Sequence, residues 1–156
     1  MVKLHLGCGK KKFRGYINID NVGTPDVWAD ITALPYGLET AEEILAIHVF
    51  EHIFPHLAEA TLKHWYGILK PGGKLIMEMP DLKKVIAFFG MKDAPASHTM
   101  FALYGGEQTG RIEDVHKWCW TYSVLEPALT AIGFKCEEKP ALFHIPERDF
   151  RIEATK

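Results

Sequence analysis

The sequence has little of what would mark an unusual chemistry or environment. It has three cysteines in 156 residues, Cys8, Cys119 and Cys136, and no Cys-x-x-Cys pair, which argues against a disulfide framework and a thiolate zinc site. Lys and Arg form no long run and the formal net charge is -2, so general attraction to nucleic acid or anionic lipid is not indicated. The first apolar run stops at Gly7, too short for a signal-peptide core or a membrane span. We therefore expect a soluble cytoplasmic protein without nucleic acid as a partner.

What is present indicates one α/β domain over residues 1–156. A chain of this length, 47% hydrophobic, can bury about two-thirds of its unfolded surface. Short apolar runs alternate with helical patterns, which predicts a mostly parallel sheet. Strands are expected at 2–6, 16–19, 27–29, 44–47, 74–79, 134–138 and 148–154, and helices at 57–69, 82–89 and 123–133. Residues 91–120 have no clean period, and we expect them to form a lid or acceptor-binding insertion.

The residues just after each expected strand deserve to be read together, because ligands of open parallel sheets bind outside the carboxyl ends of the strands. Gly7-Cys8-Gly9 follows the first strand, and its two glycines allow a ligand to approach the backbone closely. Gly-x-Gly alone fits an ordinary turn equally well. Its value as evidence depends on the other strand ends.

Two carboxylates follow the next two strands. Asp20 can accept hydrogen bonds from both hydroxyls of a ribose, although it also fits a solvated turn. Asp30 can accept from an adenine amine while Ile31 covers one face of the base, although Asp30 also fits a helix cap. Three such placements at successive strand ends predict a site for a nucleoside-bearing ligand.

Five segments in the same order resemble motifs of class I S-adenosylmethionine-dependent methyltransferases. They are 4–9 (the glycine motif), 18–20 (the ribose-binding strand end), 29–31 with 34–35 (the adenine-side loop), 47–52 (after the fourth strand) and 69–75 (the turn into the fifth). The resemblance implies a Rossmann-like, doubly wound, mostly parallel seven-stranded sheet with a closing antiparallel hairpin and helices on both faces. It also implies S-adenosylmethionine as cofactor, S-adenosylhomocysteine as product, and cofactor contacts from Leu6, Gly7, Cys8, Gly9, Asp20, Asp30, Ile31 and His48.

The sequence departs from the family pattern at two points. His5 stands where the family usually has an acidic residue, and the link from Gly9 to Asp20 leaves little room for the usual helix. A short subgroup with the same compact link is associated with glycan or cell-surface polymer enzymes. The resemblance therefore points to a sugar or glycan hydroxyl as acceptor, while the residues themselves leave a lipid, a small metabolite and a macromolecule open as alternatives.

Four residues are candidates for catalysis. Methyl transfer is an in-line displacement that mainly needs positioning, and a general base is optional. His48, at the end of the fourth strand, is the best placed base if its role is more than bordering the cofactor. Glu51 and His52 follow within one turn and either face the acceptor or begin the next helix. His116 is a second candidate base from the irregular segment, where a solvated histidine is the plain alternative.

Two other classes of function compete with methyl transfer. His48-x-x-Glu51-His52 matches a zinc metalloprotease pattern, but only if both histidines share one continuous helix, which the aliphatic run 44–47 and Pro55 argue against. We therefore expect no metal site. A binding module for a nucleoside cofactor that has lost its chemistry is the second alternative, and His5 keeps it open.

Overall fold

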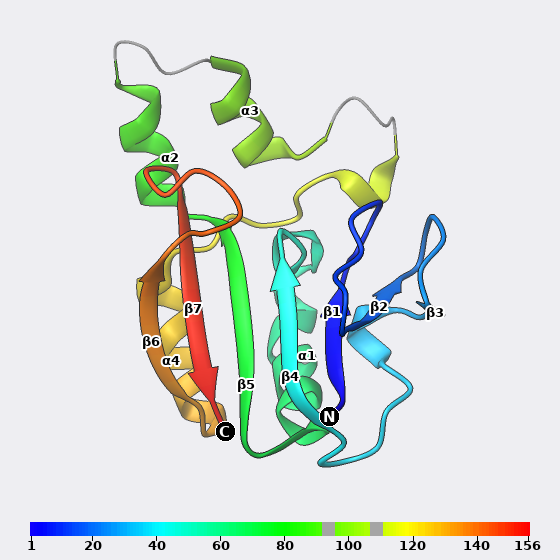
Figure 1. Cartoon of the computed structure of the whole chain (residues 1–156). Coiled ribbons are helices and arrows are strands. Elements are labelled where there is room, and N and C mark those ends of the chain that lie inside the picture. The colour runs from blue at the N-terminus through cyan, green and yellow to red at the C-terminus, as the bar shows by residue number, and fades with distance from the viewer. Residues whose placement is uncertain (92–95, 107–110) are drawn as a thin grey trace.

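The computed structural model describes residues 1–91, 96–106 and 111–156. Its centre is one seven-stranded sheet in the order β3-β2-β1-β4-β5-β7-β6 (Figure 1). The strands are β1 (Lys3–Leu6), β2 (Ile17–Asp20), β3 (Val27–Trp28), β4 (Ala41–Ile47), β5 (Leu69–Pro80), β6 (Lys135–Pro140) and β7 (Asp149–Thr155). The first five pair in parallel, whereas β7 runs antiparallel to both β5 and β6. The expected mixed sheet with its closing hairpin is confirmed.

The helices are arranged less evenly than expected. They are α1 (Pro55–Ile68), α2 (Leu82–Phe89), α3 (Ala96–Tyr104) and α4 (Tyr122–Ile132), with the short 3-10 turns η1 (Ile31–Ala33), η2 (Phe50–His52) and η4 (Ile112–Asp114). Figure 1 shows α1 and α4 on the same face of the sheet, with α2 and α3 beyond the carboxyl end of β5. We expected helices on both faces. In the part of the chain that the structure describes, the connection between β1 and β2 contains no helix.

Loop side chains pack where a second helix layer was expected. Asn18 fixes the loop after β1, because its side-chain oxygen accepts from the Phe13 amide at 2.8 Å and from the His5 ring at 2.9 Å. The Phe13 ring then contacts the His5 ring, with centroids 4.6 Å apart, and the Phe143 ring, 5.5 Å away. Burial lowers the pKa of His5 despite the Asn18 contact, so His5 packs here as a neutral ring.

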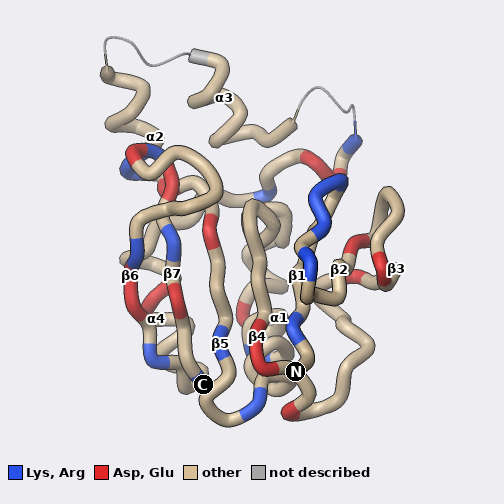
Figure 2. Tube along the Cα trace, viewed as in Figure 1, with Lys and Arg blue, Asp and Glu red and all other residues tan. Residues whose placement is uncertain are grey.

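Charge on the loop after β1 is partly neutralised within the chain. Figure 2 shows the basic residues of 10–14 on this loop, beside acidic residues of the β2–β3 region. Lys12 forms an ion pair with Asp26 at 2.7 Å. Lys12 of the short basic run is therefore paired within the chain.

The core lies between the sheet and the helical face. Trp65 of α1 and Phe50 are fully buried there with the aliphatic residues of β4 and β5. β4 and β5 both begin earlier than their apolar runs predict, at Ala41 and Leu69, because a bulge lets the pairing continue past Glu43. No helix in the described ranges is long and apolar enough to cross a membrane.

Candidate functional site

Two adjoining cavities lie at the carboxyl ends of the parallel strands. The larger cavity has a volume of 670 Å³ and lies at the point where the strand order reverses, between β1 and β4, as expected for a doubly wound sheet. Its lining includes six of the eight residues expected to contact a cofactor: Gly7, Gly9, Asp20, Asp30, Ile31 and His48. Leu6 and Cys8 do not line it, because their side chains are buried in the core.

The two glycines of the turn face different surroundings. Both have positive φ angles, +61° at Gly7 and +50° at Gly9. A β-carbon on Gly7 would lie 2.0 Å from Cγ2 of Val49, so the turn after β1 packs directly on the segment after β4. A β-carbon on Gly9 would meet no atom within 4 Å. Gly9 therefore leaves space at the cavity wall that a ligand can use.

Asp20 and Asp30 both hold local structure and line the larger cavity. Asp20 is buried, and its two carboxylate oxygens accept from the amides of Gly9 at 2.7 Å and Val22 at 3.0 Å. Asp30 caps η1 by accepting from the Thr32 amide at 2.8 Å. Each carboxylate oxygen has a second lone pair, so a turn or cap role does not prevent ligand binding. Each carboxylate can therefore stabilise its turn or cap and bind a ligand at the same time.

The smaller cavity has a volume of 420 Å³ and lies beside the first. Its lining residues are His48, His52, Pro80, Phe101, Ala102, Gly105, Gly106, Asp114, His116, His144 and Arg148. His48, His52 and Asp114 line both cavities. The described parts of the irregular segment 91–120 contribute to both walls, through α3 and η4. Residues 92–95 and 107–110 of that segment lie outside the described residues.

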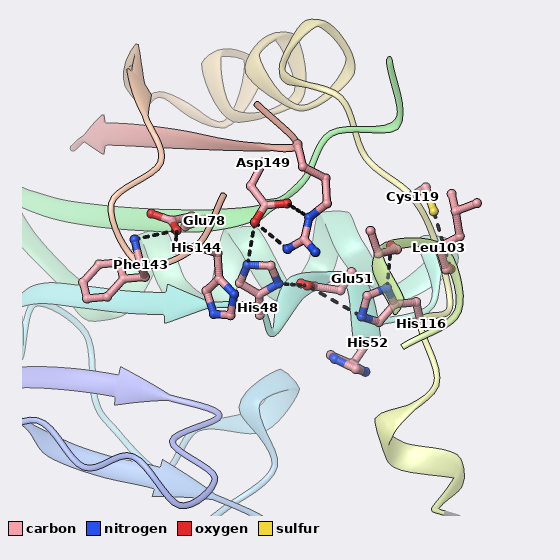
Figure 3. A network of polar contacts seen from close by, with 12 residues as sticks. His48, Glu51, His52, Glu78, Leu103, His116, Cys119, Phe143, His144 and Asp149 are labelled. Carbon is pink, nitrogen blue, oxygen red and sulfur yellow. Dashed lines mark hydrogen bonds and ion pairs between the residues drawn. The ribbon is translucent and has the colours of Figure 1, made fainter. Parts of the chain in front are cut away.

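His48 is held between two carboxylates at the junction of the cavities (Figure 3). Its φ angle is +51°, and its amide donates to the Glu78 carbonyl at 2.7 Å. Its Nδ1 lies 3.1 Å from Glu51 and its Nε2 lies 3.3 Å from Asp149. Burial would lower the pKa of His48, but Asp149 and Glu51 outweigh burial and raise it to about 9. His48 is therefore an imidazolium at neutral pH, which suits positioning better than proton removal.

The backbone brings His116 to the same place. The amides of Lys117 and Trp118 both donate to the Glu51 carbonyl, at 2.8 and 3.2 Å. Nδ1 of His116 donates to the Ala102 carbonyl at 3.0 Å, which leaves its Nε2 as an acceptor 3.9 Å from Glu51. Burial lowers the pKa of His116, so its ring is neutral at pH 7. All four candidate catalytic residues thus meet in one region, with Glu51 beneath the cavity walls.

The structure does not form the helix that a zinc hydrolase would need. β4 ends at Ile47, η2 covers only Phe50–His52, and α1 begins at Pro55. His48 has left-handed backbone geometry, so it is not one helical turn before His52. The His48-x-x-Glu51-His52 pattern therefore lacks the structural context of that class.

Three residues of this region were missed by the sequence argument. Asp149 and Arg148 lie at the start of β7, and two hydrogen bonds of 2.7 and 2.8 Å join their side chains. His144 stacks near His48, with ring centroids 4.0 Å apart. Its loop is held by Glu78, whose carboxylate accepts the amides of 142–144 at 2.8 to 2.9 Å. The charged pair before an alternating strand was the signal available for Asp149.

Comparisons with known proteins agree with this geometry. A family model described as a methyltransferase domain matches residues 10–77. A SAM-dependent methyltransferase from Archaeoglobus fulgidus superposes with a TM-score of 0.67 at 17% identity, over 99% of this chain and 85% of that one. One from Mesorhizobium loti gives 0.65 at 13%, over 99% and 90%.

A third solved structure carries ligands. It is the 1,6-didemethyltoxoflavin-N1-methyltransferase of Burkholderia thailandensis with 1,6-didemethyltoxoflavin and S-adenosylhomocysteine, with a TM-score of 0.66 at 16% identity over 99% of this chain and 70% of that one. No curated protein sequence matches the chain. The similarity to solved structures extends over nearly the whole fold, while the family match covers the region from the loop after the glycine turn into β5.

Proposed function

We propose that this S-adenosylmethionine-dependent methyltransferase holds its cofactor in the larger cavity and methylates a small molecule bound in the smaller one. The observation that carries the proposal is the convergence of four strand ends on the larger cavity, with His48 at its boundary with the second. Bound S-adenosylmethionine supplies a methyl carbon activated by its sulfonium sulfur. A module that only bound a nucleoside would not need the second cavity.

The lining of the larger cavity fits the cofactor. The space beside Gly9 admits a ligand against the backbone, and the buried carboxylate of Asp20 is placed to accept from a ribose. On the other side, Asp30 stands next to Ile31, so an adenine ring would find an acceptor for its amine and an apolar cover together. Gly7, Gly9, Asp20, Asp30, Ile31 and His48 are the proposed contacts, with Leu6 and Cys8 contributing through backbone only.

The smaller cavity suits an acceptor the size of one sugar residue. Its 420 Å³ is near the lower end of pockets for small molecules, about 300 to 1,000 Å³. Its wall combines Phe101 with polar histidine and arginine side chains, a mixture that can bind a sugar ring and its hydroxyls. We propose a sugar or glycan hydroxyl as the acceptor, and residues 91–120 as the segment that selects it.

The four candidate catalytic residues divide into two roles. His48 already contacts Glu51 and Asp149, so we assign it to positioning at the junction of the cavities. His52 and His116 line the smaller cavity with Glu51 buried beside them, and we assign to these three residues the activation of the acceptor hydroxyl. The residues of the chain otherwise serve to orient the two ligands and to exclude water.

Calorimetry with S-adenosylmethionine and S-adenosylhomocysteine tests the cofactor site. Asp20→Ala should weaken binding at least tenfold, which is about 1.4 kcal/mol. Asp26→Ala is the matched control, since Asp26 accepts hydrogen bonds in the same region, from Asn18 and Lys12, but does not line the cavity. Its binding should stay within about twofold of the wild type. Absence of binding by the wild type would overturn the proposal.

A further inference from the structure

Glu51, His52 and His116 form a compact set of ligand atoms beside the smaller cavity. One donor atom from each side chain lies within 4.8 Å of the other two. His52 and His116 line the cavity. Figure 3 shows Glu51 between His48 and His116. Two imidazoles and one carboxylate form a common ligand set for divalent transition metals.

Glu51 is the strongest sign that a cation belongs here. The residue is 1% exposed, and the Oε2 atom of its carboxylate has no hydrogen-bond donor among the described residues. Within the described ranges, its only short contact to a cation is the ion pair of Oε1 with His48, at 3.1 Å. A buried carboxylate oxygen without a donor costs free energy unless a cation compensates it. The second oxygen, Oε2, is free to bind one.

The two histidines are oriented as metal ligands usually are. Nδ1 of His52 donates to the Val115 carbonyl at 3.2 Å, and Nδ1 of His116 donates to the Ala102 carbonyl at 3.0 Å. Metal-bound histidines almost always donate their other ring nitrogen in this way, which fixes the tautomer and the direction of the ring. In both residues the Nε2 lone pair remains available.

A neighbouring cluster of possible ligands is less suited to binding a metal cation. His48, His144 and Asp149 also bring donor atoms within 4.8 Å of one another. However, Arg148 already binds both oxygens of Asp149, at 2.7 and 2.8 Å. This guanidinium already neutralises the carboxylate and would repel a metal cation, so this cluster is an ion-pair network.

We propose that Glu51, His52 and His116 bind a divalent transition-metal cation whose open positions face the smaller cavity. This differs from the sequence-based expectation of no metal. Only the role of the cation rests on the proposed function: an acceptor hydroxyl bound to it would release its proton to water more readily. The oxygen–carbon bond to the methyl group would then form as the sulfur–carbon bond breaks, and the sulfur would keep the electron pair.

Titration with Co²⁺ tests the site without an activity assay. Chelator-treated protein should bind one equivalent of Co²⁺ and develop its visible absorption bands. Glu51→Gln and His116→Gln should each weaken this binding at least tenfold, which is about 1.4 kcal/mol. His56→Ala is the matched control, because His56 is an exposed histidine in the first turn of α1. It should bind Co²⁺ as the wild type does.

The control variants and ligands distinguish failure of the metal-site proposal from failure of the proposed function. Absence of Co²⁺ binding by the wild type would overturn the proposal, and so would equal weakening by His56→Ala. Weakening by His144→Ala but not by Glu51→Gln would place the ion in the other cluster and also overturn it. Calorimetry with S-adenosylhomocysteine should give near wild-type affinity for His116→Gln, which shows that the variant is folded. Failure of the cofactor to bind the wild type would instead count against the proposed function alone.

Discussion

Single residues of the glycine turn carry different constraints although they share positive φ angles. Gly9→Ala and Gly15→Ala should each destabilise the protein by about 1 kcal/mol, because both sites have left-handed backbone and space for a β-carbon. Gly9→Ala, unlike Gly15→Ala, should also weaken S-adenosylmethionine binding at least tenfold, since Gly9 lines the larger cavity and Gly15 does not. Denaturant unfolding and calorimetry measure the two effects. Equal cofactor affinity in both variants would show that no ligand approaches Gly9.

Substitution of Gly7 should mainly lower the stability of the fold. A β-carbon there meets Val49 at 2.0 Å, so Gly7→Ala adds overpacking of roughly 1 to 3 kcal/mol to the backbone strain. The double variant Gly7→Ala with Val49→Ala removes the clashing methyl groups and should recover part of this loss. If the double variant were as unstable as the sum of the single ones, the contact with Val49 would not be the cause.

The residues that the sequence predicted at the site are those that follow parallel strands. Asp20 and Asp30 could be located because each comes directly after an apolar run. Whether they act as turn residues or as ligands could not be decided from the sequence, and the structure shows that the turn roles leave lone pairs free. The sequence marked His116 as a candidate, but its position could not be predicted. The segment is held by the amides of Lys117 and Trp118, which donate to the carbonyl of Glu51, far away in the sequence.

At the level of elements, the antiparallel direction of β7 explains why Asp149 was missed. The amino end of an antiparallel strand lies at the same edge as the carboxyl ends of its parallel neighbours, and β7 pairs with β5 in this way. Because the sequence prediction considered only residues that follow strands, it could not find a site residue at the start of an antiparallel strand. α3 was also not predicted; it packs against α2, and its position depends on tertiary contacts more than on its own pattern.

Asp149 should tie β7 to the end of β4 through His48. Burial would raise its pKa, but His48 and Arg148 outweigh burial and lower it from 3.8 to about 2. Asp149→Asn leaves two cations facing each other and should destabilise the protein by about 3 kcal/mol at pH 7. Since the folded pKa is depressed, the stabilisation by Asp149 is complete above pH 3.8 and is lost as the pH falls through about 2.

Denaturant unfolding at several pH values measures this dependence. The difference in unfolding free energy between wild type and Asp149→Asn should narrow as the pH falls from 4 towards 2. Glu137→Gln, at an exposed position on β6, should change stability by less than about 0.5 kcal/mol at every pH. A constant difference for Asp149→Asn would show that the carboxylate charge does not stabilise the junction.

Across the whole molecule, the sequence determined the cofactor end of the site better than the acceptor end. The larger cavity is built from strand ends whose order follows from the parallel sheet. The smaller cavity depends on α3 and on 111–116, which are positioned by a backbone bridge between Gly105 and Val115. A β-carbon on Gly105 would lie 2.2 Å from the Asp114 carbonyl oxygen, so this bridge requires glycine. No periodic pattern in the sequence predicts such a contact.

The two proposed ligands should therefore stabilise the folded chain separately. S-adenosylmethionine at 100 times its dissociation constant should raise the unfolding free energy by about 2.7 kcal/mol. For Asp20→Ala at the same concentration the gain should fall to about 1.4 kcal/mol, while the gain from Co²⁺ should be unchanged. Glu51→Gln should show the reverse, losing the stabilisation by Co²⁺ alone.

The stabilisation by Co²⁺ should be smaller than its affinity for the folded protein implies, because histidines of the unfolded chain also bind metal. Thermal unfolding with each ligand and with both measures these gains. If either variant lost both together, the cofactor and metal sites would be a single cooperative unit and the division into two cavities would be wrong.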